Sequence, residues 1–204
     1  ACIRRPHPEA HSAGPVDLVP EGGRGLSLRL GYGTTLADTD SWNFQYDGPQ
    51  SIKLGSGRDS ANLRFSSERG DGVTVVRTYT FRADSYAFDH RVEILGLSEP
   101  SARRDLWIGW PGVEPTDAKE DRKAAASVAR IDGSVDRQDY GAFSKETSEI
   151  PRVGSIDWVT SQSRYFMAAV APVDAAFRET RAVGGPDAQI VGFRAGLPIE
   201  GQQV

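Results

Sequence analysis

Two alternating runs at residues 73–82 and 86–95, VTVVRTYTFR and YAFDHRVEIL, constrain the fold more than any other feature of this chain. Strand side chains alternate between two faces, and β-branched and aromatic residues favour strands. On one face the first run would carry Val73, Val75, Tyr79 and Phe81. On the same face the second run would carry Tyr86, Phe88, Val92 and Ile94. The runs therefore predict an antiparallel hairpin whose apolar face must be covered by another layer.

Short alternating runs bounded by Gly, Pro or Asp continue along the chain and predict further strands. Before the hairpin they lie at residues 26–30, 42–46, 51–54 and 61–68. After it they lie at 105–110, 155–162, 164–171, 176–183 and 189–197. Residues 124–132 fit a helix or a strand, but Gly133 and the alternation after it favour a strand pair, and residues 144–154 predict a polar loop. No long amphipathic helix is expected, so about a dozen strands predict an all-β antiparallel sandwich or larger two-sheet assembly.

The ends of the chain predict one domain with a tail. Residues 1–14 contain two prolines and no apolar periodicity, which predicts a disordered tail before a single domain at 15–204. His7 and His11 have the spacing of a helical metal pair, but Pro6 and Pro8 exclude that helix. The sole cysteine, Cys2, allows no internal disulfide, and no apolar export segment precedes it to suggest a lipid anchor.

Charge and hydropathy exclude two classes of partner. Lys and Arg total 24 against 28 Asp and Glu, a net charge of −4, and the basic residues are scattered, which argues against nucleic acid. The longest apolar run, Phe166–Pro172, is far shorter than the ~20 residues of a membrane-spanning helix. The sequence as given therefore predicts a soluble domain.

His90 is the strongest candidate for a catalytic acid, with Glu93 as its base. The strand pattern places His90 on the face of Phe88 and Val92, whereas Glu93 points to the opposite face. We therefore expect His90 to be a half-buried packing residue.

The remaining candidates for chemistry lack the spacing that each chemistry needs. The carboxylates at 117–121 lack the glycine and alternation of a calcium loop, and GSGRDS at 55–60 lacks the ending of a phosphate loop. Ser161 and Ser163 have no G-x-S-x-G turn. Trp107 and Trp110 could stack on a sugar ring but are expected to fill a core. We predict no catalytic residue, no cofactor, no metal and no small-molecule substrate.

Two stretches, RTYTFRADSYAFDHRVEI at 77–94 and DWVTSQSRYFMAAVAP at 157–172, together resemble the periplasmic domain of the YidC membrane protein insertase family. The second has a tryptophan, a polar run, an aromatic pair and a small-apolar strand that ends at proline. Its matching residues are Trp158, Gln162, Arg164, Tyr165, Phe166, Ala168, Ala169 and Pro172. FRAGLP at 193–198 resembles the closing strands, so the resemblance covers roughly Pro15 to Gly201.

The resemblance implies a twisted antiparallel β-supersandwich, the architecture of galactose-mutarotase-like proteins. It also implies a place on the periplasmic side of the bacterial inner membrane, between a membrane anchor and a multi-helix core. That core inserts membrane proteins, alone or beside the Sec translocon. The opening strands before VDLVPEGG (16–23) are missing or replaced by the tail, and the core does not follow Val204. The expected function is thus a non-catalytic domain whose partners are client proteins and translocon components, with membrane contact only through segments outside this sequence.

The matched residues are expected to have structural roles. Tyr165 and Phe166 would place one ring on each face of a strand, and Arg164 would pair with a carboxylate. The alanines at 168, 169 and 171 would let another layer approach closely. Two alternatives remain open at this point. A mutarotase-type epimerase would need a histidine acid and a carboxylate base in one cleft, and a carbohydrate-binding sandwich would use Trp107 or Trp110.

Overall fold

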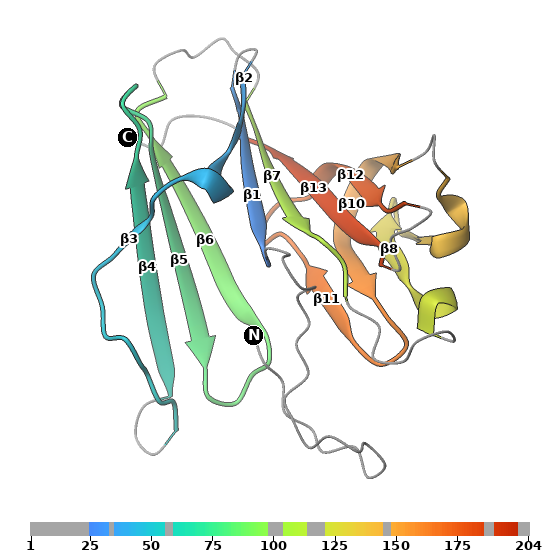
Figure 1. Ribbon diagram of the computed structural model, residues 1–204, viewed down its shortest axis with the longest axis horizontal. Helices are drawn as coiled ribbons and strands as arrows, with labels where there is room; N and C mark the ends of the chain where they lie inside the picture. Colours follow the sequence, from blue (N-terminus) through green and yellow to red (C-terminus); the bar gives the residue numbers. More distant parts are fainter. Residues whose placement is uncertain are drawn as a thin grey trace. The chain divides into compact units, whose positions relative to one another are not determined.

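The computed structural model describes residues 25–32, 35–55, 59–97, 104–113, 121–144, 148–185 and 190–199 (Figure 1). All strand pairs in these ranges are antiparallel. The strands are β1 Ser27–Tyr32, β2 Thr35–Asp38, β3 Gln45–Tyr46, β4 Ser60–Glu68, β5 Thr74–Arg82, β6 Phe88–Leu95, β7 Arg104–Trp110, β8 Ala126–Ile131, β9 Ser134–Asp139, β10 Glu149–Gln162, β11 Met167–Val170, β12 Phe177–Val183 and β13 Gly192–Pro198. The short 3-10 helices are η1 Thr39–Ser41, η2 Asp121–Ala124 and η3 Tyr140–Ala142. The predicted all-β antiparallel class is confirmed, and within these ranges no helix has the length and apolarity to cross a membrane.

The chain divides into two compact units, residues 41–102 and the remainder on both sides. The smaller unit contains a four-stranded sheet in the order β3-β4-β5-β6. The larger unit contains a nine-stranded sheet in the order β2-β1-β7-β13-β12-β10-β8-β9, with β11 paired to β10. The single domain expected over residues 15–204 stays a prediction.

Strand β10 organises the larger sheet. It pairs with β8 along one side, and along its other side first with β12 and then with β11. The register shifts between Val153 and Ile156, and Gly154 between them has φ +153°. A Cβ at Gly154 would lie 2.6 Å from Ile131 Cγ2, so glycine is required where the strand bends. On this side, β10 pairs with β12 before and at the end of the bulge and with β11 after it.

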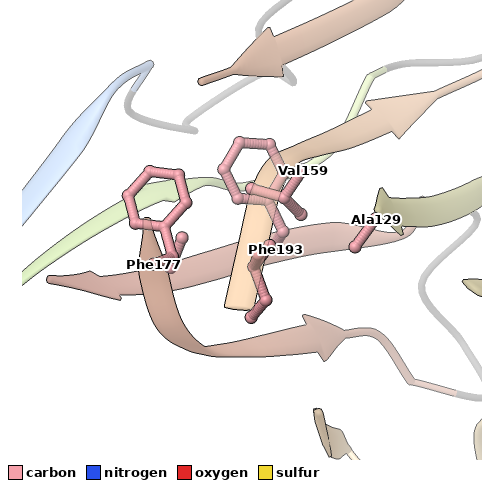
Figure 2. Close-up of a cluster of buried hydrophobic side chains, with 6 residues drawn as sticks. Ala129, Val159, Phe177 and Phe193 are labelled. Atoms are coloured by element: carbon pink, nitrogen blue, oxygen red, sulfur yellow. The ribbon is translucent and has the colours of Figure 1, made fainter. Parts of the chain in front are cut away.

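The core of the larger unit lies on one face of this sheet. Phe177 and Phe193 are almost fully buried, and their neighbours Ala129 and Val159 come from β8 and β10 (Figure 2). Burial of an aromatic side chain of this size contributes about 2–3 kcal/mol. A second buried cluster consists of Ala125, Phe143, Ala182 and Val191. Strands β8, β10, β12 and β13 are therefore held together by shared apolar contacts.

The smaller sheet confirms the predicted hairpin. Val75 lies opposite Ile94 and Phe81 opposite Phe88, so the apolar positions of β5 and β6 share a face as expected. Tyr86 was expected on that face, but it precedes β6 and its side chain is 76% exposed. The predicted strand began at Tyr86, two residues before β6, because Tyr86 fits the apolar pattern although it belongs to the turn.

Further expectations about where the strands lie were wrong, and one strand was not expected. Residues 51–54 form no strand, whereas residues 35–38 form the unpredicted β2. The polar loop expected at 144–154 contains the first part of β10. The strand expected at 164–171 begins only at Met167, so Tyr165 and Phe166 do not lie on opposite faces of a strand. The tail at 1–14, the carboxylates at 117–120 and residues 56–58 lie outside the described ranges.

Candidate functional site

His90 is held inside a cluster of rings and a guanidinium. Its Nε2 accepts a hydrogen bond from Arg77 Nε at 3.3 Å, and its ring stacks on Tyr79 with centroids 4.5 Å apart. Burial, and secondly the charge of Arg77, lower the pKa of His90 to about 4. The imidazole is therefore neutral at pH 7 and has no proton to spare as a general acid. Its Nδ1 is buried without a hydrogen-bond partner in the described part of the chain.

Glu93, the expected catalytic partner, lies on the other face of the sheet. In the antiparallel pair, His90 lies opposite Tyr79 and Glu93 lies opposite Val76. Side chains of a strand alternate between its two faces, so Tyr79 and Val76, an odd number of residues apart, lie on opposite faces. The carboxylate of Glu93 pairs instead with Arg91 at 3.4 Å. The predicted separation of His90 and Glu93 is confirmed, and these two side chains cannot act on one substrate atom.

Arg77 is the residue of this face that the sequence pattern did not identify. It is 8% exposed on β5, and its guanidinium lies 5.9 Å from the ring centroid of Phe44 and 5.5 Å from that of Tyr79. Aromatic contacts continue along the same face, with Tyr46 stacked on Phe65 at 4.9 Å. Cation–π contacts replace part of the hydration that a buried guanidinium loses. The arrangement holds charge inside an apolar face and offers no nucleophile.

Ser161 is fully buried and both of its hydrogen-bonding functions are used. Its hydroxyl donates to the carbonyl of Val191 at 2.6 Å and accepts from the amide of Val113 at 3.0 Å. The two bonds join β10 to segments 48 and 30 residues away. Ser161 therefore ties the core together and is not positioned as a nucleophile.

Trp107 and Trp110 are both engaged with their own sheet. The guanidinium of Arg181 lies 5.3 Å from the Trp107 ring centroid, and the same ring lies directly against Gly196, where a Cβ would be 3.1 Å from it. Trp110 donates its indole N–H to the carbonyl of Gly112 at 3.0 Å and packs against the core. Neither ring is presented as a bare stacking platform.

Arg181, which contacts the ring of Trp107, belongs to a network of charged side chains. Glu149 on β10 accepts hydrogen bonds from Arg194 and from Arg181, the latter at 3.2 Å. Arg181 also donates to Glu179 at 2.8 Å. The hydrogen bonds to Glu149 and Glu179 raise the pKa of Arg181. These charges neutralise one another across β10, β12 and β13.

The matched family residues gather at the turn between β10 and β11. Ser163 donates its amide to the carbonyl of Phe166 at 2.8 Å and closes the turn. Arg164 and Tyr165 form its exposed tip, with the guanidinium 5.4 Å from the ring centroid. Phe166 is half-buried. Three matched residues outside the turn are half-buried as well: Trp158 and Gln162 on β10, and Pro172 after β11. Their structural role stays a prediction, as does a carboxylate partner for Arg164.

Within the described ranges, no three or more His, Cys, Asp or Glu side chains lie together as the ligands of a metal ion would. Among the residues described above, Arg77 and Ser161 are buried and have partners inside the protein. Its unassigned features are the exposed turn at 164–165 and the strand that follows it.

Comparison with known proteins identifies relatives of this chain. The family model described as the YidC periplasmic domain matches residues 7–202. A membrane protein insertase YidC of Nitratidesulfovibrio vulgaris is 32% identical over 144 residues, which is 66% of this chain and 24% of that protein. Those of Pelodictyon phaeoclathratiforme (27% over 166 residues; 78% and 28%) and Chlorobaculum parvum (25% over 174 residues; 83% and 29%) are also similar. The chain spans about a quarter of the length of these relatives.

Proposed function

Because the chain belongs to the family of YidC periplasmic domains, we propose that it supports the insertion of membrane proteins as a domain that catalyses no reaction itself. The observation that carries this proposal is the family match over residues 7–202, which includes every described residue. The parent protein would be an inner-membrane insertase, and this domain would lie on the periplasmic side of that membrane.

The internal partners of the candidate reactive groups support a non-catalytic role. His90 is neutral and stacked against Tyr79, and Ser161 is saturated by two backbone groups. A general acid needs a proton to donate and access to substrate, and a nucleophile needs a base beside it. Neither requirement is met at His90 or Ser161.

The proposed partners are membrane-protein clients and components of the Sec translocon. Each of the two compact β-units is a folded body, and the larger one has a buried apolar core, so either could offer a surface on which such partners dock. The domain would act through its surface, as a spacer and docking platform beside the membrane core. We further propose that residues 15–204 behave as one domain.

The gene and an insertion assay test this proposal. Translation beyond Val204 should give a cluster of helices of ~20 apolar residues each. In cells depleted of the native insertase, the full-length protein should restore insertion of client proteins, measured by protease protection. Removal of residues 25–199 should reduce insertion of some clients or the recovery of Sec components with the insertase. Unchanged insertion and unchanged recovery would overturn the accessory role.

An enzyme assay tests the non-catalytic part separately. The purified chain should not accelerate mutarotation of glucose or galactose beyond the buffer rate. Acceleration that disappears in His90→Ala would establish an epimerase and overturn the proposal.

A further inference from the structure

Strand β11 lies at an edge of the larger sheet. It pairs with β10 in the register Gln162–Met167, Ser161–Ala168 and Thr160–Ala169, and no other described strand pairs with it. The closing pair of the turn, Ser163 and Phe166, is hydrogen-bonded. In an antiparallel ladder hydrogen-bonded and non-bonded pairs alternate. The backbone groups of Ala168 therefore face β10, and those of Met167 and Ala169 point away from it.

This edge presents the hydrogen-bonding pattern of a strand without a neighbour. Two amide donors and two carbonyl acceptors, on Met167 and Ala169, repeat every second residue, or roughly 7 Å. No described residue occupies them. The group that matches alternating donors and acceptors at this spacing is the backbone of another extended polypeptide.

The composition of β11 distinguishes it from three other edge strands. Charged side chains on an edge oppose pairing with another chain. Such charges occur on β2 (Asp38), on β6 (Asp89, Arg91, Glu93) and on β9 (Asp136, Arg137, Asp139). Residues 158–173 contain no carboxylate and a single cation, Arg164. The charges found on these three edge strands are therefore missing from β11.

Exposed apolar side chains flank the same edge. Met167 is 64% exposed, Tyr165 at the turn is 53% exposed, and Val173 beyond the strand is 81% exposed. Behind them, β10 is fixed by the buried Val159 and Ser161. A rigid strand with open backbone groups loses little conformational freedom when a partner binds.

We propose that the β11 edge binds, by strand addition, an extended segment of another polypeptide with apolar side chains at alternate positions and neutral or acidic flanks. Acidic flanks are compatible with this edge because residues 158–173 contain no carboxylate to repel them. A second copy of this chain is a poorer occupant, because four residues bury too little surface for a stable dimer and each copy carries a net charge of −4. The site goes beyond the proposed function and does not depend on the domain being needed for insertion.

The probe is the peptide acetyl-DVTVTVD-amide, added to the isotope-labelled protein and followed by NMR. The amides of Met167 and Ala169 should shift in a saturable manner and become protected from hydrogen exchange, with a dissociation constant on the order of 0.1–1 mM. The same peptide with alternate backbone nitrogens methylated should bind about tenfold more weakly, because it loses donors on one edge.

Two variants locate the binding on the strand edge. Ala169→Pro removes an outward N–H at a position where an edge strand tolerates proline, and should weaken binding about tenfold while the far-ultraviolet spectrum is retained. Met167→Lys places a charge on the edge and should also weaken binding. This variant keeps the test decisive if Ala169→Pro does not fold. Val135→Lys, an equal change at an exposed site on β9, is the matched control and should bind as wild type.

Three results would overturn the proposal. The amides of Met167 and Ala169 could prove protected before peptide is added, which would mean that the chain fills its own edge. Sedimentation could show concentration-dependent dimers that Met167→Lys dissolves, which would assign the edge to a second copy. Absence of saturable shifts at millimolar peptide would show that the edge binds no extended segment.

Discussion

The guanidinium of Arg152 donates to the carboxylate of Asp136 at 3.1 Å, although β10 and β9, from which they come, are separated in the sheet by β8. The same guanidinium donates to the carbonyl and to the hydroxyl of Ser127 on β8, at 3.4 and 2.8 Å. Its side chain is 5% exposed, whereas that of Asp136 is 41% exposed. Arg152 thus holds three strands together from the bend in β10.

Arg152→Ala should destabilise the protein by about 2–4 kcal/mol, because it leaves a void and unpaired groups on Ser127. Arg152→Met should cost less, since it fills the space without a buried charge. Urea unfolding at pH 7 measures both. Arg130→Ala, which removes a half-exposed pair with Asp157, is the control and should change stability by less than about 1 kcal/mol. An equal effect of the two alanine variants would contradict the role of Arg152.

Ser161→Ala should reduce stability by about 1–3 kcal/mol, because it leaves the amide of Val113 and the carbonyl of Val191 without their shared partner. Thermal unfolding gives the change. Ser134→Ala, at an exposed position of β9, should remain within about 0.5 kcal/mol of wild type. A neutral Ser161→Ala variant would mean that water takes over both bonds.

His90 should make the protein less stable in mild acid. Its pKa of about 4 in the folded state lies below the ordinary histidine value of 6.5, so in the window between these two pH values only the unfolded chain takes up the proton. Its contribution is complete above pH 6.5, falls as the pH drops toward 4, and is then lost. The difference in stability between wild type and His90→Gln should therefore change by about 2–3 kcal/mol across the window.

NMR titration of the His90 imidazole checks the same point directly. The signals absent from the His90→Gln spectrum should titrate near pH 4. A midpoint near 6.5 would show that the ring is open to water and would remove the argument against proton transfer at His90.

Gly96→Ala should be much more damaging than Gly72→Ala. Both glycines have positive φ, +79° and +83°, so alanine strains the backbone at either site by about 1 kcal/mol. At Gly96 a Cβ would also overlap the carbonyl oxygen of Gly72, whereas at Gly72 the space is open. Chemical denaturation of both variants should separate the overlap from the shared strain. Equal losses would mean that the loop relaxes freely.

The sequence predicted what depends on short stretches of chain. The β5–β6 hairpin follows from alternation within 23 residues, and the β8–β9 strand pair follows from Gly133 and the alternation after it; Gly133 has positive φ in the turn between them. His90 and Glu93 were correctly placed on opposite faces for the same reason.

The sequence could not predict what depends on distant partners. Arg77 and Arg152 were not identified, because an arginine in an alternating pattern is expected to face water. Their burial depends on Phe44 in one case and on Ser127 in the other. The first part of β10 was missed because Pro151 and Gly154 both indicate a break, and only pairing with β12 makes that segment a strand.

The position of β10 has a mechanical consequence. Among the described strands, β12 and β8 are hydrogen-bonded to opposite sides of β10 and not to each other, so no other ladder joins the two halves of the larger sheet. A force that peels β8 and β9 away therefore has to break only the β8–β10 ladder, and the ladder between β10 and β12 would remain. Under tension the larger sheet should part along β10, and proteolytic cleavage within β10 should loosen the strands on both of its sides.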